Sequence, residues 1–137
     1  MSYAMAEALQ GAIYAQIQGD VAVSSLIGSA VFDAVPTGSL PDTYAVLGAE
    51  TVLDRSDKTG AGAEHRLTIS VISDAAGFAT AKAVAVAISD ALEGADLSLA
   101  RGRLVFLKFD RAVARREGSG NTRRIDLRFR ARVEDSV

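Results

Sequence analysis

The chain has 137 residues, a formal net charge of −2 and no cysteine. This length fits one domain, residues 1–137, with enough buried surface for its own core. The lack of cysteine excludes disulfides and thiolate metal sites. We expect a soluble chain without a signal peptide, because no apolar run approaches the roughly 20 residues of a membrane span and no charged segment before an apolar stretch opens the sequence.

The first half of the sequence predicts a helix followed by three strands. Met5, Leu9 and Ile13 recur at helical spacing until Gly19. Further on, apolar residues alternate with polar ones, which is typical of a strand with one buried face. The expected elements are the first helix, a helical turn over 21–27, and strands at 31–35, 44–53 and 65–73.

The segment 54–64 connects the second and third strands. Its eleven residues exceed the two to five of a usual hairpin loop. Long loops are commonly functional or mobile, so we expect this one to order on assembly. Its charged residues are candidate interface residues: Asp54, Arg55, Asp57 and Lys58.

The next segment, 75–93, predicts an amphipathic helix. Ala81, Val84 and Ile88 mark its apolar stripe, and Gly94 ends it. Val86 lies within the opposite, polar stripe. A single exposed valine is usually without significance, but in an assembling protein Val86 is a candidate subunit contact.

The chain closes with a long predicted β-hairpin. Its arms are 103–116 and 124–134, and its tip, 117–122, consists of turn-forming residues. In the first arm we expect Val105, Leu107, Phe109 and Val113 to share one side. The element order predicts an α+β fold: a mainly antiparallel sheet with two main helices packed on one face. The helix at 75–93 leaves open whether its flanking strands form a parallel pair.

Charge is distributed unevenly along the sequence. Residues 1–100 carry four basic and twelve acidic side chains, whereas residues 101–137 carry eleven basic and five acidic ones. A GC-rich genome could explain the preference for arginine over lysine but not this concentration. The polarity suits a subunit whose acidic region meets a neighbour's basic region, or one that faces nucleic acid.

Arginines are the most distinctive side chains of the hairpin. Two pairs flank its tip, so we expect pairing of the arms to bring four guanidinium groups close together. Three more share a face of the last strand. They fit either a solvated sheet edge or a patch that binds a neighbour's carboxylates or nucleic-acid phosphates. The last strand offers no exposed aromatic face for stacking bases. The candidate interface arginines are Arg115, Arg116, Arg123 and Arg124 at the tip, and Arg128, Arg130 and Arg132 on the strand.

The sequence contains little that could support catalysis. His65 is the single histidine, with no partner at metal-ligand spacing. No serine lies in a nucleophile-elbow motif, and Gly60-Ala61-Gly62 precedes a strand rather than the helix that a phosphate loop needs. We therefore expect no enzyme activity, no metal and no cofactor.

Several strings, in this order and spacing, resemble the tail-completion, or tail-terminator, family of long-tailed phages, in the version found in gene transfer agents of alphaproteobacteria. The resemblance covers nearly the whole chain. The strings are ALQGAIYAQI, VFDAVP, LGAETVLDRSDKTGAGAEHRLTISV after Tyr44, AKAVAVAISDAL, RLVFLKF and DLRFRARVE.

This resemblance implies a structural α+β subunit of a homo-oligomeric ring, usually a hexamer. Such a ring ends the tail tube at the head-proximal end of a virion, after assembly in the bacterial cytoplasm. The implied partners are further copies of the chain, the tail tube protein and the head connector or stopper, with a lumen that DNA can pass through and no membrane. Two alternatives remain open: another neck component, such as a head-closure or adaptor protein, and an accessory nucleic-acid-binding module.

Overall fold

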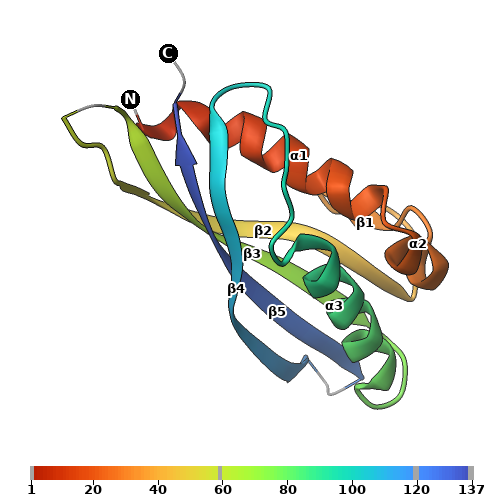
Figure 1. Cartoon of the computed structure of the whole chain (residues 1–137). Coiled ribbons are helices and arrows are strands. Elements are labelled where there is room, and N and C mark those ends of the chain that lie inside the picture. Colours follow the sequence, from red (N-terminus) through yellow and green to blue (C-terminus); the bar gives the residue numbers. More distant parts are fainter. Residues whose placement is uncertain (1, 59, 119–120, 136–137) are drawn as a thin grey trace.

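The computed structural model describes residues 2–58, 60–118 and 121–135, and its elements are shown in Figure 1. Thr59 and residues 119–120, which belong to the predicted loop and hairpin tip, lie outside the described part. The elements are η1 (Ser2–Met5), α1 (Ala6–Gln18), α2 (Val21–Ile27), β1 (Val31–Phe32), β2 (Thr43–Asp54), β3 (Gly62–Ser73), α3 (Ala79–Leu92), β4 (Arg103–Glu117) and β5 (Thr122–Glu134).

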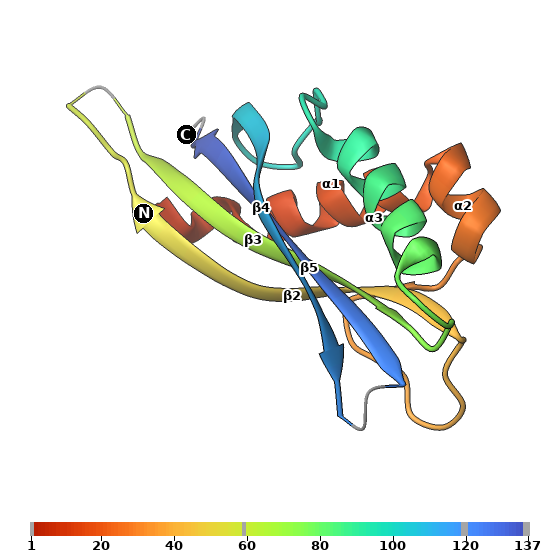
Figure 2. The ribbon, with the colours of Figure 1, turned by 90° about the horizontal axis from the view of Figure 1, so that it is seen from below.

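The five strands form one sheet in the order β1-β2-β3-β5-β4. All neighbours pair antiparallel except β1 and β2, which are parallel. Strands β3 and β4, which flank α3 in sequence, are separated by β5 and do not pair. The helices cover one face of the sheet and leave the other open (Figure 2). These features confirm the predicted α+β class, its helix-covered face and its C-terminal hairpin.

The core lies between the helices and the covered face of the sheet. Strand β5 supplies alternate residues to it, and Phe129 at its centre is fully buried. Helix α3 contributes the predicted apolar stripe, with Ala81, Val84 and Ile88 all buried. Apolar residues recur every two residues in the strand and about every 3.6 residues in the helix, and both spacings therefore place them on the surfaces where sheet and helix face each other.

Strand β4 departs from the predicted alternation. Its pairing with β5 shifts register between Leu104 and Phe106 and again between Phe109 and Arg111. Each irregularity inserts an extra residue, which moves the following side chains to the other face. Leu107 and Phe109 therefore face the helices as expected, whereas the prediction for Val113 was wrong, because its partner Asp126 lies on the open face.

Two further elements are shorter than predicted. Strand β1 ends at Phe32 instead of Val35, where the chain turns and the Asp33 carboxylate accepts a hydrogen bond from Gln10 (2.7 Å). Helix α3 begins at Ala79 instead of Ala75. Gly77 has φ +71°, a left-handed conformation that no α-helix contains.

The two hairpin turns lie at opposite ends of the sheet. The turn between β2 and β3 lies at the same end as η1 and the last residues of β5, since Gly62 pairs with Glu134. The turn between β4 and β5 lies at the other end (Figure 1). None of the described helices is long and apolar enough to cross a membrane.

Candidate assembly surfaces

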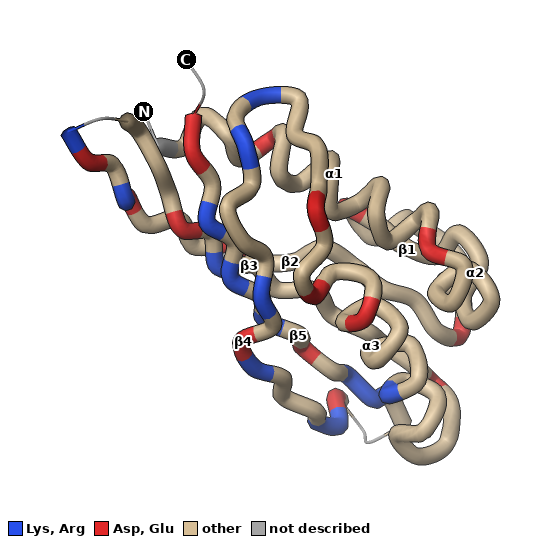
Figure 3. Tube along the Cα trace, in the orientation of Figure 1, with Lys and Arg blue, Asp and Glu red and all other residues tan. Residues whose placement is uncertain are grey.

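The four tip arginines do not form a single cluster. Register pairs Arg115 with Arg124 and Arg116 with Arg123. Because successive residues of a strand point to opposite faces, the first pair lies on the open face and the second on the helix-covered face. Figure 3 shows how cationic residues follow both arms of the hairpin. The expectation that pairing the arms brings all four guanidinium groups together was wrong.

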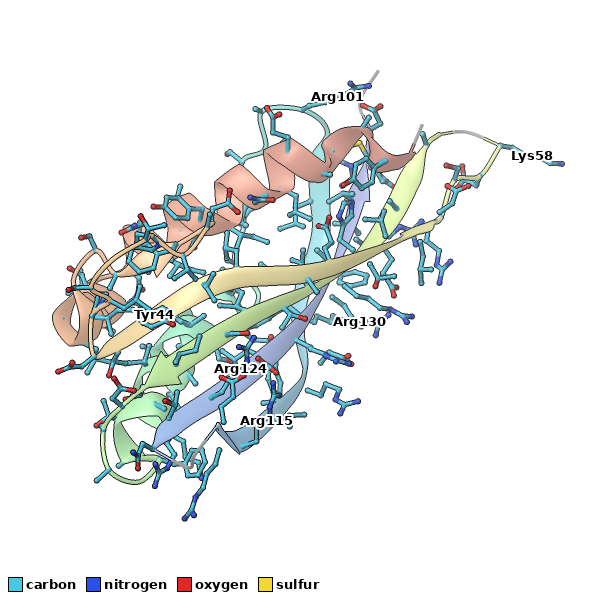
Figure 4. All side chains as sticks on the ribbon, turned by 180° about the vertical axis from the view of Figure 1, so that it is seen from behind. Tyr44, Lys58, Arg101, Arg115, Arg124 and Arg130 are labelled. Atoms are coloured by element: carbon cyan, nitrogen blue, oxygen red, sulfur yellow. The ribbon has the colours of Figure 1, made fainter. Side chains whose placement is uncertain are left out.

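On the open face, Arg115 and Arg124 converge on Asp126 (Figure 4). Arg115 Nη1 lies 2.7 Å from Asp126 Oδ2, and Arg124 Nε lies 2.9 Å from Asp126 Oδ1. Ser70 Oγ donates a third hydrogen bond to this carboxylate (2.6 Å). The pair is therefore largely satisfied within the chain, and Asp126 is a site residue that sequence analysis missed.

On the helix-covered face, Arg116 and Arg123 have different surroundings. The Arg123 guanidinium lies 5.6 Å from the ring centroid of Phe78, at the start of α3. Arg116 is exposed and has no hydrogen bond or ion pair with the described residues. Arg116 is thus the tip arginine most available to an external anion.

The arginines of β5 share the open face, as predicted from their spacing. Arg130 Nη2 lies 3.0 Å from Glu64 Oε1, and Arg66 Nε lies 3.0 Å from Glu64 Oε2. Arg132 donates to the Arg55 carbonyl oxygen (3.1 Å). Arg128 has no ionic partner among the described residues. The face is therefore a set of ion pairs between strands with a few available cations, rather than a uniformly free basic patch.

Two carboxylates within these pairs have altered pKa values. The hydrogen bond from Arg130 lowers the pKa of Glu64; burial opposes this, and Arg66 adds to it. Burial alone would raise the pKa of Asp126, but hydrogen bonds from Ser70, Arg124 and Arg115 outweigh it and hold that pKa below its ordinary value. Both groups therefore favour the folded state most when they are ionised.

We expect acid to weaken the fold through these two carboxylates. Their stabilisation is fully present above their ordinary pKa values of 4.5 and 3.8 and is lost as pH falls through the lower values of the folded state. Urea unfolding across this pH range should show Glu64→Gln and Asp126→Asn to be less acid-sensitive than the wild type. Asp90→Asn, on the exposed side of α3, is the control. An unchanged pH dependence in both variants would contradict the assignment.

The connection between β2 and β3 is shorter than the predicted 54–64 loop. Strands β2 and β3 extend to Asp54 and from Gly62. Arg55 N donates to the Gly62 carbonyl (2.8 Å), and Asp57 N donates to the Gly60 carbonyl (2.9 Å). Backbone hydrogen bonds therefore link the two described sides of this connection, and Lys58 projects at its end (Figure 4). Its role in contacting a neighbour remains a prediction.

Val86 borders an apolar groove between α3 and β4. The side chain is 58% exposed, and Phe109, which lines the same groove of about 310 Å³, is 43% exposed. Ala112 and Ala114 continue this lining along β4, and Lys82 lies at its α3 side. We call this region, together with Arg116 beyond Ala114, the α3–β4 surface.

A second groove, of about 560 Å³, lies between α1 and β2 at the opposite edge of the sheet. Its lining has three carboxylates and no lysine or arginine. Sequence analysis missed it because its residues come from three separate segments. We call it the α1–β2 groove, and its lining includes Tyr3, Glu7, Gln10, Gly11, Tyr14, Asp33 and Glu50.

His65 lies in the core beside this groove. It is fully buried, and its Nδ1 is 3.0 Å from Glu50 Oε2. Its Nε2 has no hydrogen-bond partner among the described residues. No group of three or more histidine or acidic residues in the described part could hold a metal ion.

Two comparisons with known proteins agree with each other. The family described as "Tail completion protein gp17" matches residues 11–134. A chain from the solved structure "Virion of native gene transfer agent (GTA) particle" is 64% identical, with a TM-score of 0.93 over 97% of this chain and 99% of that chain. No curated protein matches the sequence. The two matches confirm the resemblance carried by the sequence strings.

Proposed function

Because this chain belongs to the tail completion protein gp17 family, we propose that it is a structural subunit of a ring that terminates the tail tube of a phage-like particle and joins it to the head connector. The observation that carries this proposal is the 64% identity, over 97% of the chain, to a protein of a gene transfer agent virion. We assign it no catalytic role.

The shape of the subunit supports contacts along a tail axis in both directions. The β2–β3 connection and the adjoining ends of β4 and β5 lie at opposite ends of one twisted sheet (Figures 1 and 2). Lys58 lies at the first of these ends (Figure 4), and Arg123, which pairs with Arg116, lies at the second. In a ring whose axis runs roughly along the strands, one end would meet the tail tube protein and the other the head connector. DNA would pass through the lumen of such a ring.

Deleting the gene in a particle-producing bacterium is expected to leave heads and tails unjoined, with tails of variable length, in electron micrographs. Wild-type complementation should restore joined particles. Complementation with Lys58→Glu or with Arg123→Glu should instead impair one connection of the ring, either to the tail tube or to the head connector. Each substitution reverses a charge at only one end of the subunit. One variant should give heads without tails and the other tails of uncontrolled length.

The gene deletion tests the proposed function, and the two point variants test the end contacts, so each has its own contradicting outcome. Normal joined particles after deletion would exclude the proposed function. Normal particles with both point variants would exclude the end contacts alone. Circular dichroism of each purified variant is the control for folding, since Arg123 is half-buried beside Phe78.

The two alternatives differ in binding behaviour. A head-closure or adaptor protein would neither bind purified tube protein nor limit tube length, whereas a terminator does both. A nucleic-acid-binding module would bind DNA with an affinity that falls steeply with added salt. We expect tube binding, and no DNA binding by the free subunit near physiological salt, because most open-face arginines are paired with carboxylates of their own chain.

A further inference from the structure

We propose that the α3–β4 surface of one subunit docks against the α1–β2 groove of a second copy of this chain. The proposal deepens the proposed function and rests on it, because it supplies the lateral contact that a ring needs. Both surfaces lie on the helix-covered side of the sheet, and they lie at its opposite edges. A head-to-tail arrangement brings them together without inverting either subunit.

The α3–β4 surface has an apolar centre, two cations toward the end where β4 meets β5, and the Glu93 carboxylate beside Phe109. Val86 and Phe109 are the exposed apolar side chains, and Ala112 and Ala114 leave a shallow path between them and the end of the strand. Lys82 flanks this path on the α3 side, and Arg116 lies on the same face of β4 one step beyond Ala114. Neither cation has a carboxylate partner among the described residues.

The α1–β2 groove has the complementary character. Glu7, Asp33 and Glu50 line it, and Asp33 and Glu50 are held in place by Gln10 and His65. Glu7 is exposed and has no partner among the described residues. Tyr3 is 62% exposed and provides an aromatic surface for the partner's apolar centre. Charge of one sign therefore meets charge of the other across a partly apolar contact.

Gly11 offers an independent reason to expect a neighbour at this groove. It lies within α1, where glycine is unfavourable relative to alanine. An added Cβ would meet no atom within 4 Å, so packing inside the subunit does not require the glycine. A bare helix surface that faces a groove permits close approach by another chain.

The backbone at both edges is also available. The end of α3 covers the first part of β4, where Phe109 N donates to Glu93 and Gly94 N donates to the Leu107 carbonyl. Beyond Asp110 the outer edge of β4 has no strand partner in the described chain, and β1 pairs with β2 only at Ala45 and Val46. Two unpaired sheet edges of one chain can complete each other's hydrogen bonds.

The test is a charge-swap mixing experiment followed by mass photometry. Variant A carries Lys82→Glu and Arg116→Glu, and variant B carries Glu7→Lys and Asp33→Lys. Each alone places like charges in every contact, so its self-association should be at least about tenfold weaker than that of the wild type. An equimolar mixture should assemble again, into rings with even numbers of alternating A and B subunits.

A matched control carries Arg111→Glu and Arg128→Glu, the same charge change as variant A but on the open face. It should assemble like the wild type, and circular dichroism should show that every variant is folded. The inference is overturned if variant A or variant B alone assembles as well as the wild type, or if their equimolar mixture does not assemble. It is also overturned if the open-face control loses self-association as variant A does, or if the wild type is monomeric at every soluble concentration. Any of these results, combined with unjoined particles after gene deletion, would exclude this interface and keep the proposed function.

Discussion

Replacing Phe129 with alanine is expected to lower the free energy of unfolding by about 3–5 kcal/mol, the usual cost of removing a buried phenylalanine. Phe129 lies at the centre of β5, is fully buried and is among the largest buried side chains. Its ring contacts that of Phe109 edge to face, with centroids 5.9 Å apart. The truncation would leave a cavity between the sheet and the helices that the surrounding structure fills only in part.

Urea unfolding followed by circular dichroism measures this loss. The protein should be dilute, because self-association adds to apparent stability. Phe109→Ala is the matched control: it removes the same side chain from a partly exposed site and should cost clearly less. Equal losses in the two variants would show that Phe129 does not hold the centre of the core.

A second large loss is expected for Gly102→Ala, at about 2–5 kcal/mol, the sum of backbone strain and overpacking. Gly102 has φ +72°, and a Cβ there would overlap the Glu134 carbonyl oxygen and crowd Met5. The carbonyl belongs to the backbone of the sheet and cannot turn aside. The connection between α3 and β4 would have to move away from the end of β5.

Gly118→Ala separates the two contributions. Gly118 has φ +63°, but a Cβ there would meet no atom within 4 Å. This control should therefore lose only the conformational part, about 1–2 kcal/mol. Thermal unfolding of both variants makes the comparison, and a Gly102→Ala midpoint no lower than that of Gly118→Ala would contradict the steric argument.

Much of the fold could be predicted because the sequence patterns are local. The strict alternation of β5 and the stripe of α3 each come from one face being buried, and both reappear in the structure. The predictions were less accurate where the backbone departs from a regular helix or strand. Two register shifts turn side chains of β4 to the other face of the sheet, and the left-handed Gly77 prevents α3 from beginning at Ala75.

The candidate surfaces were predictable only in part, because charge pairing depends on strand register. Arg115 and Arg116 are adjacent in sequence, yet they lie on opposite faces of the sheet and have different partners. Asp126 and Glu64 form ion pairs with arginines from neighbouring strands. The spacing of residues within one segment cannot predict such pairs. Val86 was identified from helical periodicity alone, whereas the α1–β2 groove required the fold.

The meeting of η1 with the end of β5 has a practical consequence. Gly62 pairs with Glu134, and η1 contacts the same strands, so both ends of the described chain lie beside the β2–β3 turn. A gold cluster or fluorescent protein fused near either terminus would therefore label one and the same pole of the subunit. In a tagged particle, the order of that label, the head and the tail would report the polarity of the assembly directly.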